Sequence, residues 1–114
     1  MEYVACEYAV ARLGAVRVPL AVLLADADHV YMMNFARCTT LVYHEKLAAR
    51  VLQMQPQLTT VRHYVCVSDE PGRVPAGHLH LQALLQSHDA TPRTAAIDPE
   101  DLAGIYFTGG TTGR

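Results

Sequence analysis

Apolar and polar positions along the chain follow two different spacings, and these predict alternating helices and strands. Apolar residues recur at helical spacing in four segments, residues 2–13, 26–35, 45–55 and 78–87. In the clearest of them, the third, the apolar residues share one face and Pro56 ends the run. Gly14 is a natural stop for the first helix, and Asp26 or Asp28 is the expected N-cap of the second.

Between and after these helices lie short apolar segments rich in β-branched or aromatic residues. They span residues 16–20, 38–43, 61–68 and 102–107, and we expect them to be strands. The alternation of helix and strand favours a parallel sheet of about four strands with right-handed crossovers and helices on its faces, which is an α/β fold. Ligands of such sheets bind at the carboxyl ends of the strands. A site is therefore expected where a predicted strand ends.

The composition is that of a globular protein with a nearly neutral charge. The 114 residues are 51% hydrophobic and 18% charged, enough for one modest domain or part of a larger one. The formal net charge is −2, and Lys46 is the only lysine among nine basic residues. Because the sequence has no basic patch, nucleic acid is not expected as a partner.

Cysteine usage and hydropathy favour a cytoplasmic protein. Cys6, Cys38 and Cys66 are odd in number and far apart in apolar surroundings, as expected of reduced thiols. They form no C-x-x-C pair of the kind that binds zinc. The longest apolar stretch, residues 18–25, is too short to span a bilayer, and the first residues lack the basic region of a signal peptide.

The most informative segment follows the last predicted strand and consists of glycine and threonine. Its members are Thr108, Gly109, Gly110, Thr111, Thr112 and Gly113. Glycine lets backbone N–H groups approach an anion closely and threonine adds a short hydroxyl donor, so this Gly/Thr segment is a candidate phosphate cradle. Its spacing fits neither a Walker A loop nor the Rossmann fingerprint. The alternative is a turn that binds no ligand.

Three parts of the chain resemble the adenylate-forming (AMP-binding) enzymes. Residues 106–114 are similar to the family signature, an aromatic residue followed by T-[SG]-G-T-T-G-x-P-K, with Gly109 where serine is commonest. Residues 7–20 resemble the segment ending in G-A-[VI]-x-V-P-L, and residues 97–105 resemble the acidic lead-in D-P-x-D-L-A-x-I. The resemblance implies that residues 1–114 are part of the large N-terminal domain, truncated at the phosphate-binding loop.

The same resemblance implies an AMP-forming, carboxylate-activating ligase, with a fatty-acid acyl-CoA synthetase as the leading interpretation. Such enzymes use ATP to convert a carboxylic acid into an acyl-adenylate and pyrophosphate, and then pass the acyl group to coenzyme A or to a carrier protein. Mg²⁺ is expected to be held through the phosphates and through residues outside this chain. The catalytic residues are expected outside it too, so the isolated chain should be inactive. The alternative class is a non-catalytic α/β interaction module or a vestigial protein.

Two further groups of polar residues are candidate metal sites. His78 and His80 are two positions apart, which on a helix points them to different sides, so these histidines and His88 are expected to be solvated. Asp98 and Asp101, with Glu100 between them, are expected to form a turn at Pro99 and not to bind magnesium. The sequence therefore predicts no protein metal site.

Overall fold

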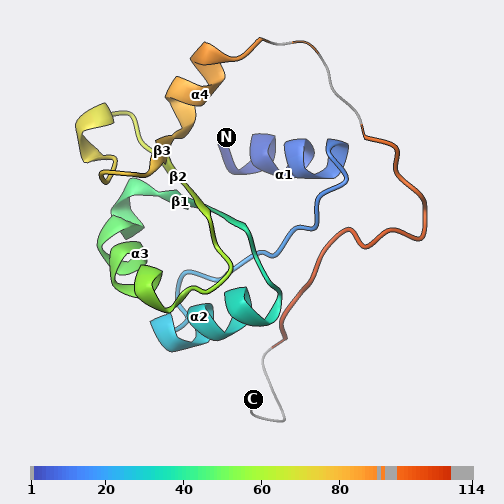
Figure 1. The fold of residues 1–114 in the computed structure, drawn as a ribbon, viewed down its shortest axis with the longest axis horizontal. Helices are drawn as coiled ribbons and strands as arrows, with labels where there is room; N and C mark the ends of the chain where they lie inside the picture. Colours follow the sequence, from blue (N-terminus) through green and yellow to red (C-terminus); the bar gives the residue numbers. More distant parts are fainter. Residues whose placement is uncertain (1, 90, 92–94, 109–114) are drawn as a thin grey trace. The chain divides into compact units, whose positions relative to one another are not determined.

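The computed structural model of the chain contains two structural units. It describes residues 2–89, 91 and 95–108. One unit combines the N-terminal residues Met1–Val22 with the C-terminal residues Arg93–Arg114. The other, Leu23–Pro92, contains the sheet and most of the helices (Figure 1).

The sheet is parallel and has three strands in the order β1-β2-β3. The strands are β1 (Thr40–His44), β2 (His63–Val67) and β3 (Leu79–His80). In the register, Thr40 pairs with His63 and His44 pairs with Val67, whereas β3 contributes only two pairs to β2. The predicted α/β fold with a parallel sheet and flanking helices is confirmed.

The helices lie close to their predicted positions. They are α1 (Glu2–Arg12), α2 (Asp26–Phe35), α3 (Ala48–Met54) and α4 (Leu81–Ser87). The predicted helix over residues 45–55 is divided, because 3₁₀ turns η1 (Glu45–Leu47) and η2 (Gln55–Gln57) flank α3. Pro56 lies in the second turn, where its missing N–H costs no α-helical hydrogen bond.

The predicted N-cap of α2 is wrong. Ala25 occupies that position, and no side chain caps the helix there. Asp26 lies in the first turn, where a carboxylate is favoured by the helix dipole, and it accepts a hydrogen bond from Arg50 Nε at 2.7 Å. Arg50 lies in α3 and also donates to the carbonyl of Leu24 at 2.9 Å, so this arginine ties the start of α2 to α3.

Two predicted strands are absent from the sheet. In the described part of the chain, residues 16–20 and 102–107 form no strand and share one parallel bridge between Arg17 and Gly104. Pro19 has no N–H to donate, so a ladder beginning at Arg17 cannot continue through it. Conversely β3 was not predicted, because residues 79–80 were assigned to the start of the helix over 78–87.

The core of the sheet unit is built around β2. Tyr64 and the three residues after it are all buried, and Cys66 has no exposed surface. A strand between two parallel neighbours is expected to be apolar along its length, and β2 is apolar after its first residue, the exposed His63. The other buried apolar residues of the unit are Met33, Tyr43, Val51, Met54 and Leu58.

His78 lies half-buried beside this core with both ring nitrogens bonded to protein groups, so the expectation that it is solvated is wrong. Its ring stacks on Tyr64 with centroids 4.7 Å apart. Its Nδ1 lies 2.6 Å from the hydroxyl of Tyr43, and its Nε2 lies 3.0 Å from Oε1 of Gln55. One neutral tautomer satisfies both contacts, since Nδ1 can accept from the hydroxyl while Nε2–H donates to the amide oxygen. Burial lowers the pKa of His78.

We predict that His78 makes the stability of the chain depend on pH. Because its pKa in the folded state is lower than the ordinary value of 6.5, the unfolded chain binds more protons between those two values. The free energy of unfolding should therefore rise with pH through that window and level off above about pH 6.5. Urea unfolding followed by circular dichroism at a series of pH values measures this.

In His78→Gln, which keeps an amide donor and acceptor but cannot titrate, the rise should be reduced. The matched control is His63→Gln, a change at an exposed histidine of β2 that should leave the rise in place. An unchanged pH dependence in His78→Gln would contradict the assignment.

Candidate functional site

The Gly/Thr segment was the candidate site, and the structure describes its first residue. Thr108 is exposed and follows residues 105–107, which lie outside any named strand. Gly109, Gly110, Thr111, Thr112 and Gly113 lie outside the described residues. The structure therefore describes residues 102–107, which we call the stem because they lead into the segment.

Backbone hydrogen bonds hold the stem, and Ala95 ahead of it, against the N-terminal part of the same unit. Ala95 N–H donates to the carbonyl of Arg12 at 3.1 Å. Arg17 N–H donates to the carbonyl of Ala103 at 3.0 Å, and Ile105 N–H donates to the carbonyl of Arg17 at 2.8 Å. Arg17 thus bonds the stem on both sides of Gly104, which is the pattern of one rung of a parallel ladder.

The acidic residues before the stem form the turn that the sequence predicts. The Asp98 carboxylate accepts from Glu100 N–H at 2.8 Å, and the Asp101 carboxylate accepts from Asp98 N–H at 2.9 Å. These carboxylates satisfy the backbone donors of their own turn. Within the part of the chain that the structure describes, no cluster of three or more Cys, His, Asp or Glu residues could hold a metal ion.

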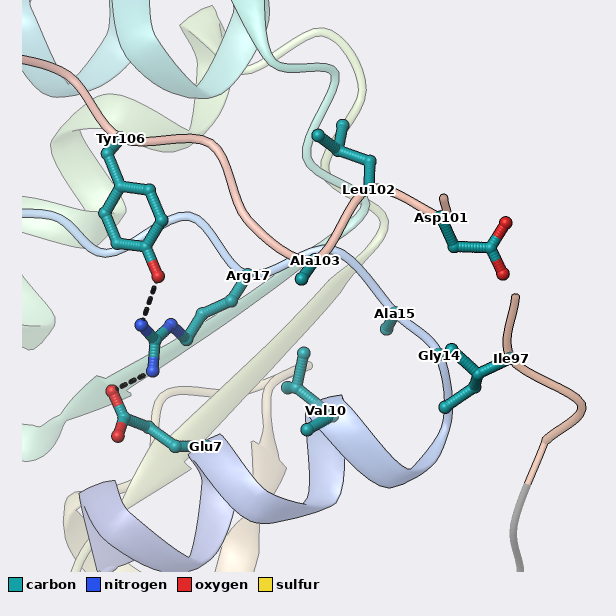
Figure 2. Close-up of a pocket in the computed structure, with 11 residues that line it drawn as sticks. Glu7, Val10, Gly14, Ala15, Arg17, Ile97, Asp101, Leu102, Ala103 and Tyr106 are labelled. Atoms are coloured by element: carbon teal, nitrogen blue, oxygen red, sulfur yellow. Dashed lines mark hydrogen bonds and ion pairs between the residues drawn. The ribbon is translucent and has the colours of Figure 1, made fainter. Parts of the chain in front are cut away.

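Side chains add a second connection at the same place (Figure 2). The guanidinium of Arg17 forms an ion pair with Glu7 of α1 and donates a hydrogen bond to the hydroxyl of Tyr106. It also lies 5.5 Å from the centre of the Tyr106 ring. We call Glu7, Arg17 and Tyr106 the Arg17 clasp. It joins a helix near the N-terminus to the stem two residues before Thr108.

The clasp is partly exposed, and its neighbours favour the charged form of Arg17. About a third of the Arg17 and Glu7 side chains is accessible, at 32% and 31%. The hydrogen bond to Tyr106 and the charge of Glu7 both raise the pKa of Arg17, so it is cationic at any physiological pH. Hydrogen bonding to Glu7 also raises the pKa of Tyr3, so the carboxylate has a second neighbour on α1.

A small pocket of about 270 Å³ lies beside the clasp. Its lining is Glu7, Val10, Ala11, Gly14, Ala15, Arg17, Ile97, Asp101, Leu102, Ala103 and Tyr106. Figure 2 shows the carboxylate of Glu7 and the hydroxyl of Tyr106 both directed at the guanidinium, with Val10 and Ile97 among the apolar walls. Because Arg17 already has two partners, the pocket offers few unused polar groups to a ligand.

Gly104 leaves room for the ring of Tyr106. A Cβ built on it would lie 2.9 Å from Cε2 and 3.1 Å from the hydroxyl oxygen of Tyr106, and 3.2 Å from the carbonyl oxygen of Arg17. Contacts this short force a shift of the ring or of the backbone. The absence of a side chain at position 104 therefore lets the Tyr106 ring fold back over the stem to reach Arg17.

A second polar cluster lies at the carboxyl end of β2, around Ser68. This serine is only 1% exposed. Its hydroxyl donates to the Glu45 carboxylate and lies 2.8 Å from the carbonyl of Glu70, and it accepts from Glu70 N–H at 3.0 Å. His80 Nε2–H donates to the Ser68 carbonyl at 2.7 Å. His80 was expected to be solvated, but it is half-buried and bonded to this carbonyl. Together with Ser68, for which the sequence predicted no role, it closes the turn after β2.

We predict that Ser68→Ala destabilises the fold by roughly 1–3 kcal/mol, the usual penalty when a buried partner loses its hydrogen bond. The change leaves the Glu45 carboxylate, whose side chain is 17% exposed, without the hydroxyl donor. Urea unfolding of the purified chain measures the loss. Ser87→Ala is the matched control, because the exposed Ser87 hydroxyl bonds the Leu84 carbonyl at 3.2 Å, and its cost should be within about 0.5 kcal/mol of zero. Equal costs for the two would contradict the role given to Ser68.

A parallel α/β fold and a Gly/Thr segment after the stem are features of a nucleotide-binding ligase class. The family model for the AMP-binding enzymes matches residues 1–114, and the chain belongs to this family. In the described part of the chain, no helix is both long and apolar enough to cross a membrane.

Three similar proteins are named as CoA ligases. The Medium-chain acyl-CoA ligase Mig of Mycobacterium avium is 32% identical over 113 residues, which are 94% of this chain and 20% of that protein. The Indoleacetate–CoA ligase of Aromatoleum aromaticum is 32% identical over 99% of this chain and 21% of its own length. The Crotonobetaine/carnitine–CoA ligase of Salmonella arizonae is 27% identical over 99% of this chain and 22% of its own. The chain thus spans about a fifth of the length of these relatives.

Solved structures show the same fold. The anthranilate CoA ligase AuaEII, in complex with anthranoyl-AMP, matches 98% of this chain and 21% of its own with a TM-score of 0.88 at 23% identity. A mutant form of the Coronafacic Acid Ligase from Pectobacterium brasiliense matches 94% of this chain and 21% of its own with a TM-score of 0.79 at 17% identity. At these identities the likeness concerns the fold.

Proposed function

We propose that residues 1–114 are the N-terminal part of the AMP-binding domain of an AMP-forming ligase that activates a carboxylic acid, with a fatty acid as the leading substrate class. The match of the family model to the whole chain carries this proposal. Two relatives at 32% identity, the medium-chain acyl-CoA ligase and the indoleacetate–CoA ligase, support a carboxylic acid as the substrate and coenzyme A as the acceptor. The reaction forms an acyl-adenylate and pyrophosphate from the acid and ATP, and the acyl group then passes to the thiol.

In this proposal the Gly/Thr segment binds the β- and γ-phosphates of ATP. Thr108, Thr111 and Thr112 contribute hydroxyl donors, and the glycines Gly109, Gly110 and Gly113 contribute backbone N–H donors. Fixed donors stabilise the charge that the phosphates carry while the carboxylate attacks the α-phosphorus, since they need no reorganisation during the reaction. Of these six residues, Thr108 is the one that the structure describes, and its exposure suits contact with a ligand.

The proposal places Mg²⁺ on the nucleotide and not on this chain. The carboxylates of the acidic turn, Asp98 and Asp101, already accept hydrogen bonds from backbone N–H groups. The ion would be held through phosphate oxygens and through residues outside residues 1–114, as is usual for magnesium on nucleotides. We further propose a cytoplasmic location, in keeping with the thiols Cys6, Cys38 and Cys66.

The activity is tested by carboxylate-dependent exchange of radioactive pyrophosphate into ATP. The whole protein that contains residues 1–114 should catalyse this exchange with at least one acid from a panel of fatty, aryl and indolyl carboxylates. Residues 1–114 alone should give no exchange above background, because the groups that act on the carboxylate and the α-phosphorus are proposed to lie elsewhere. Failure of the whole protein with every acid, in the presence of Mg²⁺, would reject the function.

We predict that Gly110→Asp in the whole protein abolishes exchange. The substitution adds a Cβ and a negative charge where the phosphates are proposed to bind. Like charges about 4 Å apart repel by about 4 kcal/mol at an effective dielectric constant of 20, which is roughly a thousandfold in rate. Thr111→Ala removes one hydrogen bond to a charged group, worth about 1.5–3 kcal/mol, so it should cost less.

Within each variant, the factor by which exchange falls should be the same for every acid tested. Both variants should retain thioester formation from a preformed acyl-adenylate, because that step does not involve the β- and γ-phosphates. A change in acid preference in place of a uniform loss would show that the segment binds something other than the phosphates of ATP.

A further inference from the structure

The strongest unassigned feature is the Arg17 clasp, because one residue fixes both the backbone and the side chain of the stem. The backbone of Arg17 bonds Ala103 and Ile105 at 3.0 and 2.8 Å. Its guanidinium bonds the Tyr106 hydroxyl while it is paired with Glu7. Arg17 therefore contacts residues 103–106 of the stem, and its ion pair with Glu7 connects them to α1.

The ring of Tyr106 packs closely against the backbone of the stem at Gly104. The ring of Tyr106 folds back over Gly104, within 2.9 Å of where a Cβ would lie. The same glycine faces the carbonyl oxygen of Arg17. The ring, the glycine and the arginine are thus packed together, so a movement of Arg17 is passed on to the backbone at 104–106.

The clasp lies next to the Gly/Thr segment in sequence. Thr108 follows Tyr106 by two residues, a reach of at most about 7 Å of extended chain. A point fixed this close limits where Thr108 can be placed. Phosphate binding by backbone donors depends on such placement, since small displacements of a positioned group reduce the rate strongly.

We infer that Arg17 is a positioning residue for the ATP half-reaction, acting through Tyr106 on the entry to the Gly/Thr segment. The inference rests on the proposed function and adds two residues, Arg17 and Tyr106, to it. Arg17 touches no reacting atom in this assignment. Its role is to hold the stem so that the donors that follow are placed before ATP arrives.

The exposure of the clasp separates this role from a purely structural one. Arg17 and Glu7 are about one-third exposed, and Tyr106 is 62% exposed. Exposed ion pairs contribute little to global stability because water and salt screen them. Loss of the clasp should therefore disturb the stem and leave the unfolding temperature of the protein nearly unchanged.

The test uses the whole protein with Arg17→Met, Arg17→Lys and Tyr106→Phe. Methionine keeps an unbranched apolar stem and removes the charge and the donors, while phenylalanine keeps the ring and removes the hydroxyl. Arg17→Met and Tyr106→Phe should each lower kcat/KM for ATP in pyrophosphate exchange by about tenfold, equivalent to about 1.4 kcal/mol of transition-state stabilisation. Lysine keeps one charged donor, so Arg17→Lys should recover part of the loss.

The double variant should be no worse than Arg17→Met alone, because both changes break the same connection. Thioester formation from preformed acyl-adenylate should stay within about twofold of the unsubstituted protein in every variant. Arg73→Met is the matched control: Arg73 is an exposed arginine that pairs with Glu70 and Glu45 in the sheet unit, and its loss should leave exchange unchanged.

Normal exchange in Arg17→Met or in Tyr106→Phe would overturn the inference while leaving the proposed function intact. Equal losses in exchange and in thioester formation, or a fall in unfolding temperature that matches the loss of activity, would also overturn it, because Arg17 would then be structural. No exchange by the unsubstituted protein would reject the proposed function itself, and this inference with it.

Discussion

The sheet unit depends on the burial of one strand on both of its faces. β2 lies between β1 and β3, and its residues from Tyr64 to Val67 are removed from water. A parallel strand in this position needs neighbours on each edge and apolar cover above and below. Polar groups at its borders must then find partners within the protein. His78, which stacks on Tyr64 of the strand, forms hydrogen bonds with Tyr43 and Gln55. Ser68 forms hydrogen bonds with Glu45 and Glu70 at the carboxyl end of the strand.

The alternation of elements could be predicted from the sequence because it is a property of local spacing. α1, α2, β1 and β2 all lie within a few residues of the segments whose apolar pattern predicted them. The errors have physical causes that spacing does not reveal. Residues 16–20 and 102–107 have apolar strand-like composition, yet Pro19 cannot donate to a ladder, and one bridge at Arg17 is what remains. β3 has only two residues, too few to produce a period of their own.

The candidate site also has a part that the sequence predicts and a part that it does not. Thr108 and the glycines after it could be predicted as a phosphate site because their chemistry is concentrated in one short run of sequence, and this prediction is not tested by the described residues. The Arg17 clasp could not be predicted, since Arg17 and Tyr106 are 89 positions apart and nothing in either neighbourhood indicates the other. His78 was expected to be solvated and Ser68 was given no role for the same reason, since each has partners from other elements that local polarity does not reveal.

Gly104 and Tyr106 together occupy a single limited volume. The ring fills the space that a side chain at position 104 would need, and the carbonyl of Arg17 closes the other side. The two positions are therefore not independent in sequence variation. An alanine at position 104 would require the exposed ring of Tyr106 to shift, and this shift would disturb the hydrogen bond between its hydroxyl and Arg17. The absence of a side chain at position 104 and the hydrogen bond from Arg17 to Tyr106 are in this way coupled.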